Sequence, residues 1–136
     1  MNILEGSPEM YRLAITRDFF AQHFLIGGDW GKENRNHSHH YQVEVRIEAA
    51  ELNQHGYLID IVELETKLAK IIETFADKTL NDLPVFHNLN PSLERFARFI
   101  WESLVESLEI DPGQLSVKLW ENDTDWAAYH QSEQPE

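Results

Sequence analysis

Apolar and polar residues alternate along the first third of the chain, a pattern typical of half-buried β-strands. The alternation covers residues 10–17 and continues without a clear break through 19–25, which predicts a first strand. Residues 27–36 are rich in glycine and polar side chains, so we expect a loop there. A second alternating run, residues 37–47, predicts the second strand.

The spacing of apolar residues then changes to that of a helix. Asp60 is a good N-cap for a helix that begins at Ile61, because the apolar residues that follow recur mostly three and four positions apart. A second helix is expected to run to about Leu108. Asn90 is its predicted N-cap and Pro91 its predicted first helical residue, since proline is favoured at that position.

Two more alternating segments, residues 115–121 and 125–130, predict a closing β-hairpin. The order strand, strand, helix, helix, strand, strand predicts an α+β fold in which both helices cover one face of a four-stranded antiparallel sheet. With 136 residues, 42% of them apolar, we expect a single domain over residues 1–136. A leader at 1–9 and a tail at 131–136 are predicted to be flexible.

Charge and composition narrow the possible partners and chemistry. The chain has 11 Lys and Arg against 24 Asp and Glu, and its formal charge of −13 disfavours nucleic acid and anionic membrane surfaces. It has no cysteine, which excludes disulfides and a thiol nucleophile and leaves nitrogen and oxygen as metal ligands. Neither a signal peptide nor a membrane-spanning apolar run is evident, so we expect a soluble protein with the cytoplasm as default compartment.

Three histidines form the strongest chemical signal in the sequence. His37 and His39 are two apart on the second predicted strand and therefore face the same way. His23 lies in the preceding strand, and pairing of the two strands would bring a third ring beside them. Three imidazoles with an open fourth position are typical of a catalytic zinc. The alternative is a polar strand edge whose rings bond to solvent or backbone. His40 faces the other way, and spacing gives no argument for ligation by His55, His87 or His130.

Several segments in colinear order resemble the 6-pyruvoyl-tetrahydropterin synthase and 6-carboxytetrahydropterin synthase family. They are Phe20-Ala21-Gln22-His23, His37-Ser38-His39-His40-Tyr41, Gly56-Tyr57-Leu58-Ile59-Asp60, Leu80-Asn81, Asn90-Pro91-Ser92-Leu93-Glu94 and Glu121.

The resemblance implies a tunnelling fold, whose subunits join edge to edge into a trimeric barrel that commonly stacks as a hexamer. It implies zinc held by His23, His37 and His39, and a pterin substrate such as dihydroneopterin triphosphate contacted by Ser92 and Glu121. A carboxylate suits that role because it accepts two parallel hydrogen bonds from the pterin ring. The implied chemistry is a zinc-dependent lyase reaction, and the pathways that use this fold include queuosine, folate and biopterin synthesis.

The expected general base differs from that of most of the family. The family usually has a cysteine four residues before the first histidine of the pair, and this chain has Glu33 there. One branch of the family has a glutamate near this position and cleaves the pterin side chain, so we predict Glu33 as the base. The alternative is a solvated loop acid, because its neighbours are polar and charged.

A second departure concerns an Asp-His pair that the family carries shortly before Leu-Asn. Ungapped counting places Ala76 and Asp77 there, and a shift of one residue matches Asp77 but puts Lys78 at the histidine position. Asp77 is therefore the remaining candidate for acid-base transfer, with His87 as a possible substitute carrier. Three hypotheses follow: a zinc-dependent pterin enzyme, an impaired paralogue that binds zinc and a pterin without turnover, or a ferredoxin-like interaction domain with coincidental histidines.

Overall fold

The computed structural model describes residues 9–131, so the predictions for the leader and the tail concern segments almost wholly outside that range. The sheet strands and the two long helices are, in chain order, β1 (Tyr11–His23), β2 (His37–Ala49), α1 (Ile61–Phe75), α2 (Leu93–Ser107), β3 (Leu115–Trp120) and β4 (Trp126–His130). Short 3₁₀ turns lie between them, including Gly31–Asn34 after β1 and two turns after α1.

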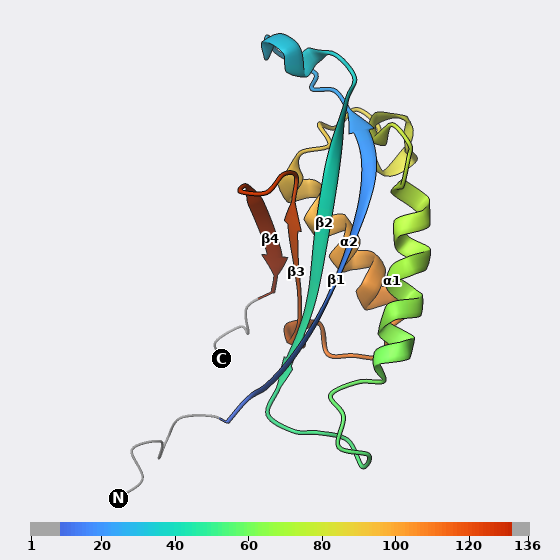
Figure 1. The fold of residues 1–136 in the computed structure, drawn as a ribbon, viewed down its shortest axis with the longest axis vertical. Coiled ribbons are helices and arrows are strands. Elements are labelled where there is room, and N and C mark those ends of the chain that lie inside the picture. The colour runs from blue at the N-terminus through green and yellow to red at the C-terminus, as the bar shows by residue number, and fades with distance from the viewer. Residues whose placement is uncertain (1–8, 132–136) are drawn as a thin grey trace, which may run out of the picture.

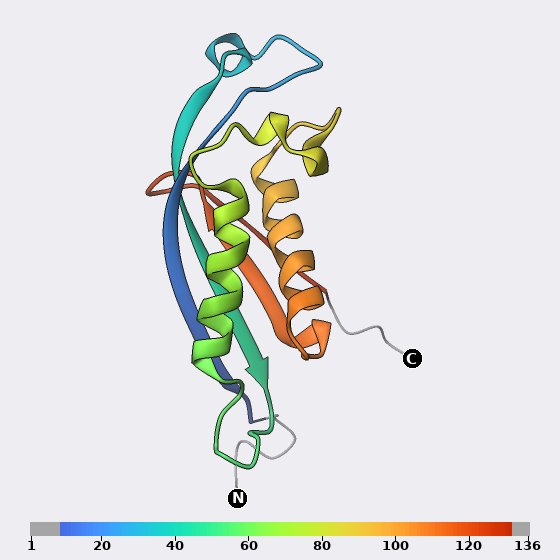
Figure 2. The same ribbon diagram turned by 90° about the vertical axis from the view of Figure 1, so that its right-hand side faces the viewer.

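The four strands form one antiparallel sheet in the order β1-β2-β3-β4. Both helices lie against one face of this sheet, as Figure 2 shows in side view. The predicted α+β class and tunnelling fold are confirmed. The loop after β1 extends beyond one end of the sheet, and the loop before α1 lies at the opposite end (Figure 1).

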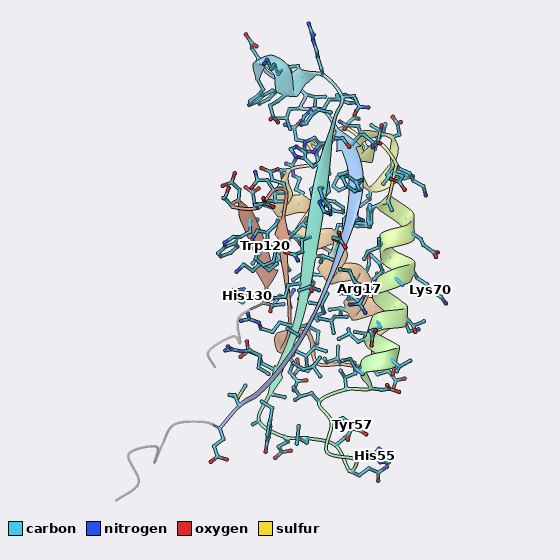
Figure 3. The ribbon with its side chains drawn as sticks, in the orientation of Figure 1. Arg17, His55, Tyr57, Lys70, Trp120 and His130 are labelled. Atoms are coloured by element: carbon cyan, nitrogen blue, oxygen red, sulfur yellow. The ribbon has the colours of Figure 1, made fainter. Side chains whose placement is uncertain are left out.

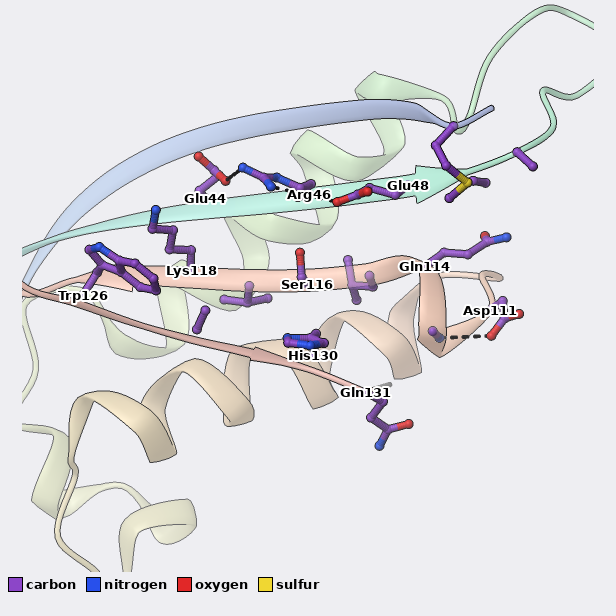
Figure 4. Close-up of a pocket in the computed structure, with 17 residues that line it drawn as sticks. Glu44, Arg46, Glu48, Asp111, Gln114, Ser116, Lys118, Trp126, His130 and Gln131 are labelled. Carbon is purple, nitrogen blue, oxygen red and sulfur yellow. Dashed lines mark hydrogen bonds and ion pairs between the residues drawn. The ribbon is translucent and has the colours of Figure 1, made fainter. Parts of the chain in front are cut away.

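No helix of residues 9–131 lies on the other face of the sheet. This face carries a groove of about 820 Å³ that is lined mainly by residues of β2, β3 and β4 and includes the polar and charged side chains of Glu44, Arg46, Lys118 and His130 (Figure 4). Within residues 9–131, no helix is both long and apolar enough to cross a membrane.

The core continues directly into the histidine segment. Alternate residues of β1 and β2 point toward the helices, and they include the buried Phe19 and Tyr41. Their rings stack at 5.4 Å, and Phe96 of α2 meets Tyr41 edge-on at 5.1 Å. Because the side-chain period of a strand is two, the same inward face also carries His23, four residues after Phe19, and His39, two residues before Tyr41. The aromatic core therefore forms the floor of the histidine group.

Helix α1 begins as predicted. The carboxylate of Asp60 accepts a hydrogen bond of 2.9 Å from the backbone N–H of Val62, so Asp60 is the N-cap and the helix starts at Ile61.

The predicted start of α2 is wrong by two residues. Ser92 is the N-cap, its hydroxyl accepts from the N–H of Arg95, and the helix begins at Leu93. The side-chain amide of Asn90 instead pairs with the backbone of Ile26, accepting from its N–H at 2.7 Å and donating to its carbonyl at 3.2 Å. In this position the Asn90 side chain makes two hydrogen bonds, one through its oxygen and one through its NH₂ group, whereas an N-cap side chain accepts only one.

Candidate metal centre

The pairing of β1 with β2 brings the three predicted histidines together at one end of the sheet. His37 lies directly across from His23, and His39 lies across from Ala21, whose small side chain leaves space for the rings. The ring centroids of His23 and His37 are 4.6 Å apart, and those of the other two pairs are each 4.8 Å apart. The three rings therefore form a compact triangle.

Backbone carbonyls orient two of these rings. His23 Nδ1 lies 3.3 Å from the carbonyl oxygen of Pro91, and His37 Nδ1 lies 2.7 Å from that of Arg35. A carbonyl only accepts, so both Nδ1 atoms carry the proton and both Nε2 atoms present a lone pair. These Nε2 atoms lie 3.0 Å apart. His39 Nε2 is buried with no hydrogen-bond partner among the described residues. A cation between them would satisfy all three rings.

Glu33 completes the group from the loop after β1. Its Oε2 lies 3.5 Å from His37 Nε2, and one donor atom from each of Glu33, His23, His37 and His39 lies within 4.8 Å of the others. Histidine nitrogen and carboxylate oxygen are both common zinc ligands, so this donor set fits the metal that the resemblance implies.

Burial keeps His23 in its neutral form. Desolvation, followed by repulsion from His39 and His37, lowers the pKa of His23 from 6.5 to about 4. The side chain is only 3% exposed. Its neighbour Tyr41, whose hydroxyl lies 3.3 Å from His23 Nδ1, has a raised pKa chiefly because it is buried. The ring of His23 is therefore uncharged at neutral pH, the form that binds metals.

Two further predicted residues lie at or beside the histidine group. Glu121 directly follows β3, and burial raises the pKa of its half-buried carboxyl; His39 opposes this rise, while the nearby carboxylate of Glu33 adds to it. Ser92 follows Pro91, the residue whose carbonyl faces His23. Its hydroxyl serves as the α2 cap.

Other predicted or considered residues lie elsewhere. Asp77 is exposed at positive φ (61°), donates its backbone N–H to the carbonyl of Phe20, and is outside the metal-ligand group. His40 faces the open side of the sheet, stacks on Phe20 and bonds Asp18 at 2.7 Å. Three more histidines are outside the group: His55 in the loop at the far end (Figure 3), His130 on the open face, and His87 after α1.

Sequence reasoning missed the side-chain amides that shape the segment between His23 and Glu33. The side-chain amide of Asn81 accepts from the N–H of Phe24 at 3.0 Å and donates to its carbonyl at 2.8 Å. The amide of Asn90 makes the same pair of bonds with the backbone of Ile26. Both asparagines stood within motifs that resemble the family. Nothing in the sequence alone indicated that they act as substitutes for a neighbouring strand.

The fold and the histidine group together define the class of this protein. The family model for 6-pyruvoyl tetrahydropterin synthase matches residues 12–132, and the chain belongs to this family of pterin-processing enzymes. The resemblance inferred from the sequence is confirmed, and the coincidental ferredoxin-like domain is excluded.

One relative in sequence agrees with this membership, and two solved structures share the fold. A 6-pyruvoyl tetrahydrobiopterin synthase of Dictyostelium discoideum is 30% identical over 102 residues, which cover 74% of each chain. The structure of Caenorhabditis elegans 6-pyruvoyl tetrahydropterin synthase has 20% identity and a TM-score of 0.81, covering 91% of this chain and 97% of its own. A Plasmodium vivax 6-pyruvoyltetrahydropterin synthase, with a glutamate described as a catalytic residue replaced by alanine, has 16% identity and a TM-score of 0.74, covering 92% and 99%.

Proposed function

We propose that this protein is a zinc-dependent lyase that acts on dihydroneopterin triphosphate or a related pterin, by proton abstraction followed by elimination or side-chain cleavage. The observation that carries the proposal is the convergence of three histidine rings with the carboxylate of Glu33. Bound zinc would be held by His23, His37 and His39 and would act as a Lewis acid that makes a proton on the substrate side chain more acidic.

Glu33 is the proposed proton acceptor. A base must approach the reacting carbon closely, and Glu33 Oε2 lies 3.5 Å from His37 Nε2, beside the proposed metal position. The P. vivax enzyme, in which a glutamate is described as catalytic, supports a carboxylate in this role.

Glu121 is the proposed anchor for the pterin ring. Its carboxylate can accept two parallel hydrogen bonds from an amino group and an adjacent ring N–H. Its electrostatic coupling to His39 and Glu33 supports a position at the edge of the same site. Ser92 is the proposed second contact, through the part of its hydroxyl hydrogen-bonding capacity that the helix cap leaves free.

The proposed role of Asp77 depends on the assembly of several copies of the protein. The sheet has two edge strands, β1 and β4, and we propose that they pair between copies to form a trimeric barrel or a hexamer. The open face would then line the barrel. Asp77 bonds to the backbone of β1, which is one of these edges, so a role in acid-base transfer would operate across the subunit boundary. The cytoplasmic location and a place in queuosine precursor synthesis stay predictions.

One observation favours a second candidate, an impaired paralogue that binds zinc and a pterin without turnover. Asp77 is followed by Lys78, whose ammonium group donates to the carbonyl of Glu73 on α1. The histidine expected beside the aspartate is therefore replaced by a cation that points to the helix.

Incubation of the zinc-loaded protein with dihydroneopterin triphosphate, with pterin products followed by chromatography, tests the proposal. We expect product formation that Glu33→Gln reduces by about 10²- to 10⁴-fold, the range for a lost general base. Asp29→Asn is the matched control, because it makes the same carboxylate-to-amide change on the same loop. Wild type that forms no more product than zinc-stripped protein would reject the enzyme, and pterin binding without product would favour the paralogue.

A further inference from the structure

The geometry points to Glu33 as a fourth protein ligand of the metal in the substrate-free protein. This inference rests on the proposed metal site and deepens it, because a site closed by a carboxylate differs from a three-histidine site with a free fourth position. The carboxylate would then have two successive roles, first as a ligand and later as the base.

Donor spacing gives the first argument. A tetrahedral metal with bonds of about 2.1 Å has donor atoms about 3.4 Å apart along each edge of the tetrahedron. His37 Nε2 lies 3.5 Å from Glu33 Oε2 and 3.0 Å from His23 Nε2. His39 completes a group whose donor atoms all lie within 4.8 Å of one another. The distance from the Glu33 oxygen to His37 Nε2 is therefore the one expected between two ligands of one tetrahedral metal, and the other donors lie within 4.8 Å.

The side from which Glu33 approaches gives the second argument. A carboxylate that only supports a ligating histidine bonds the ring nitrogen facing away from the metal. In His37 that nitrogen is Nδ1, and the carbonyl of Arg35 already accepts from it at 2.7 Å. Glu33 instead approaches Nε2, the nitrogen that also faces His23. Its oxygen thus lies on the metal side of the ring.

The loop that carries Glu33 is fixed independently of any metal. The amide of Asn34 donates to the carbonyls of Leu25 and Gly28 at 3.1 and 2.9 Å and accepts from the N–H of Trp30 at 2.8 Å. The backbone carbonyl of Glu33 accepts from the N–H of Leu25 at 2.7 Å. These bonds hold the backbone of Glu33 in place, so little conformational entropy is lost when its carboxylate binds.

The carboxylate nevertheless retains freedom to leave. The Glu33 side chain is 51% exposed, and its carboxylate contacts the neutral ring of His37 at 3.5 Å. Entry of a substrate can therefore displace the side chain without unfolding the loop. Once released it is an unligated carboxylate beside the reacting group, which is what the proposed proton transfer requires.

Cobalt(II) bound to the full-length protein tests this inference without any turnover. The chain has no cysteine, so a sulfur-to-cobalt charge-transfer band in the near ultraviolet can arise only from an introduced thiol. We expect this band in Glu33→Cys and not in Asp29→Cys, which places a thiol on the same loop. Visible absorption of the cobalt confirms that each variant is folded and loaded.

Affinity is the second readout. Glu33→Gln should bind cobalt at least about tenfold more weakly than wild type in a chelator competition, whereas Asp29→Asn should match wild type. A cobalt-loaded Glu33→Cys protein without the band, or a Glu33→Gln protein with wild-type affinity, would overturn the inference. Neither result depends on pterin turnover. A failure of the proposed metal site itself would appear separately, as wild type that does not bind cobalt.

Discussion

Acidification of the metal-free protein provides a quantitative test of the environment of His23. Burial and the two neighbouring rings lower the pKa of His23 from 6.5 to about 4 in the folded protein. Between these values the unfolded chain binds a proton that the folded chain does not, so the free energy of unfolding rises with pH in this window and falls on acidification. Above about pH 7 the effect is absent, because both states are neutral.

The size of this effect follows from the shift. A displacement of about 2.5 pKa units corresponds to about 3 kcal/mol once the pH is below both values. At about pH 5 the expected loss is about 2 kcal/mol, because the unfolded chain is then almost fully protonated at this histidine.

Urea unfolding of zinc-stripped wild type and of His23→Gln, each at about pH 7.5 and about pH 5, measures the loss. The variant removes the titrating group, and contributions from the other ionisable residues cancel to first order in the comparison. Wild type should lose about 2 kcal/mol more than the variant on acidification. Equal losses in the two proteins would refute the reasoning that this ring is held neutral by burial.

Three substitutions test the elements that support the site. Asn34→Ala should speed deuterium exchange of the backbone amides of its own loop and leave β3 unchanged; an unchanged loop would contradict the role of its amide. Asn81→Ala leaves both polar backbone groups of Phe24 without their partner and should lower the free energy of unfolding by about 1–3 kcal/mol, measured in urea. Phe96→Ala opens a cavity under the aromatic floor and should cost about 3–5 kcal/mol by the same measurement, so a loss below about 1 kcal/mol would contradict its core position.

Much of the fold follows from local patterns in the sequence. The period of two in β1 and β2 and the cap at Asp60 depend on neighbouring residues, and the structure agrees with both. The start of α2 does not follow from local patterns. Asn90 and Ser92 are both good caps, and the choice between them depends on Ile26, whose backbone lies 64 residues earlier and binds the Asn90 amide. A long-range contact of this kind has no signature in the local sequence.

Some features of the candidate site could likewise be predicted from the sequence, and others could not. Convergence of His23, His37 and His39 follows from strand period and pairing, which the sequence carries. The orientation of two rings depends instead on backbone carbonyls, which every residue has and which therefore give no signal. The approach of Glu33 depends on the path of its loop, and that path is set by the amide of Asn34 and by glycines with positive φ. Its distance to the histidines was not predictable.

Metal content of the purified protein tests the central claim most directly. If His23, His37 and His39 hold zinc, elemental analysis of full-length protein dialysed against zinc and then metal-free buffer should find one zinc per chain in wild type. In His39→Ala, which removes the ring whose buried Nε2 has no hydrogen-bond partner among the described residues, zinc should fall far below this stoichiometry. Wild type without stoichiometric zinc, or a His39→Ala protein that retains it, would contradict the account.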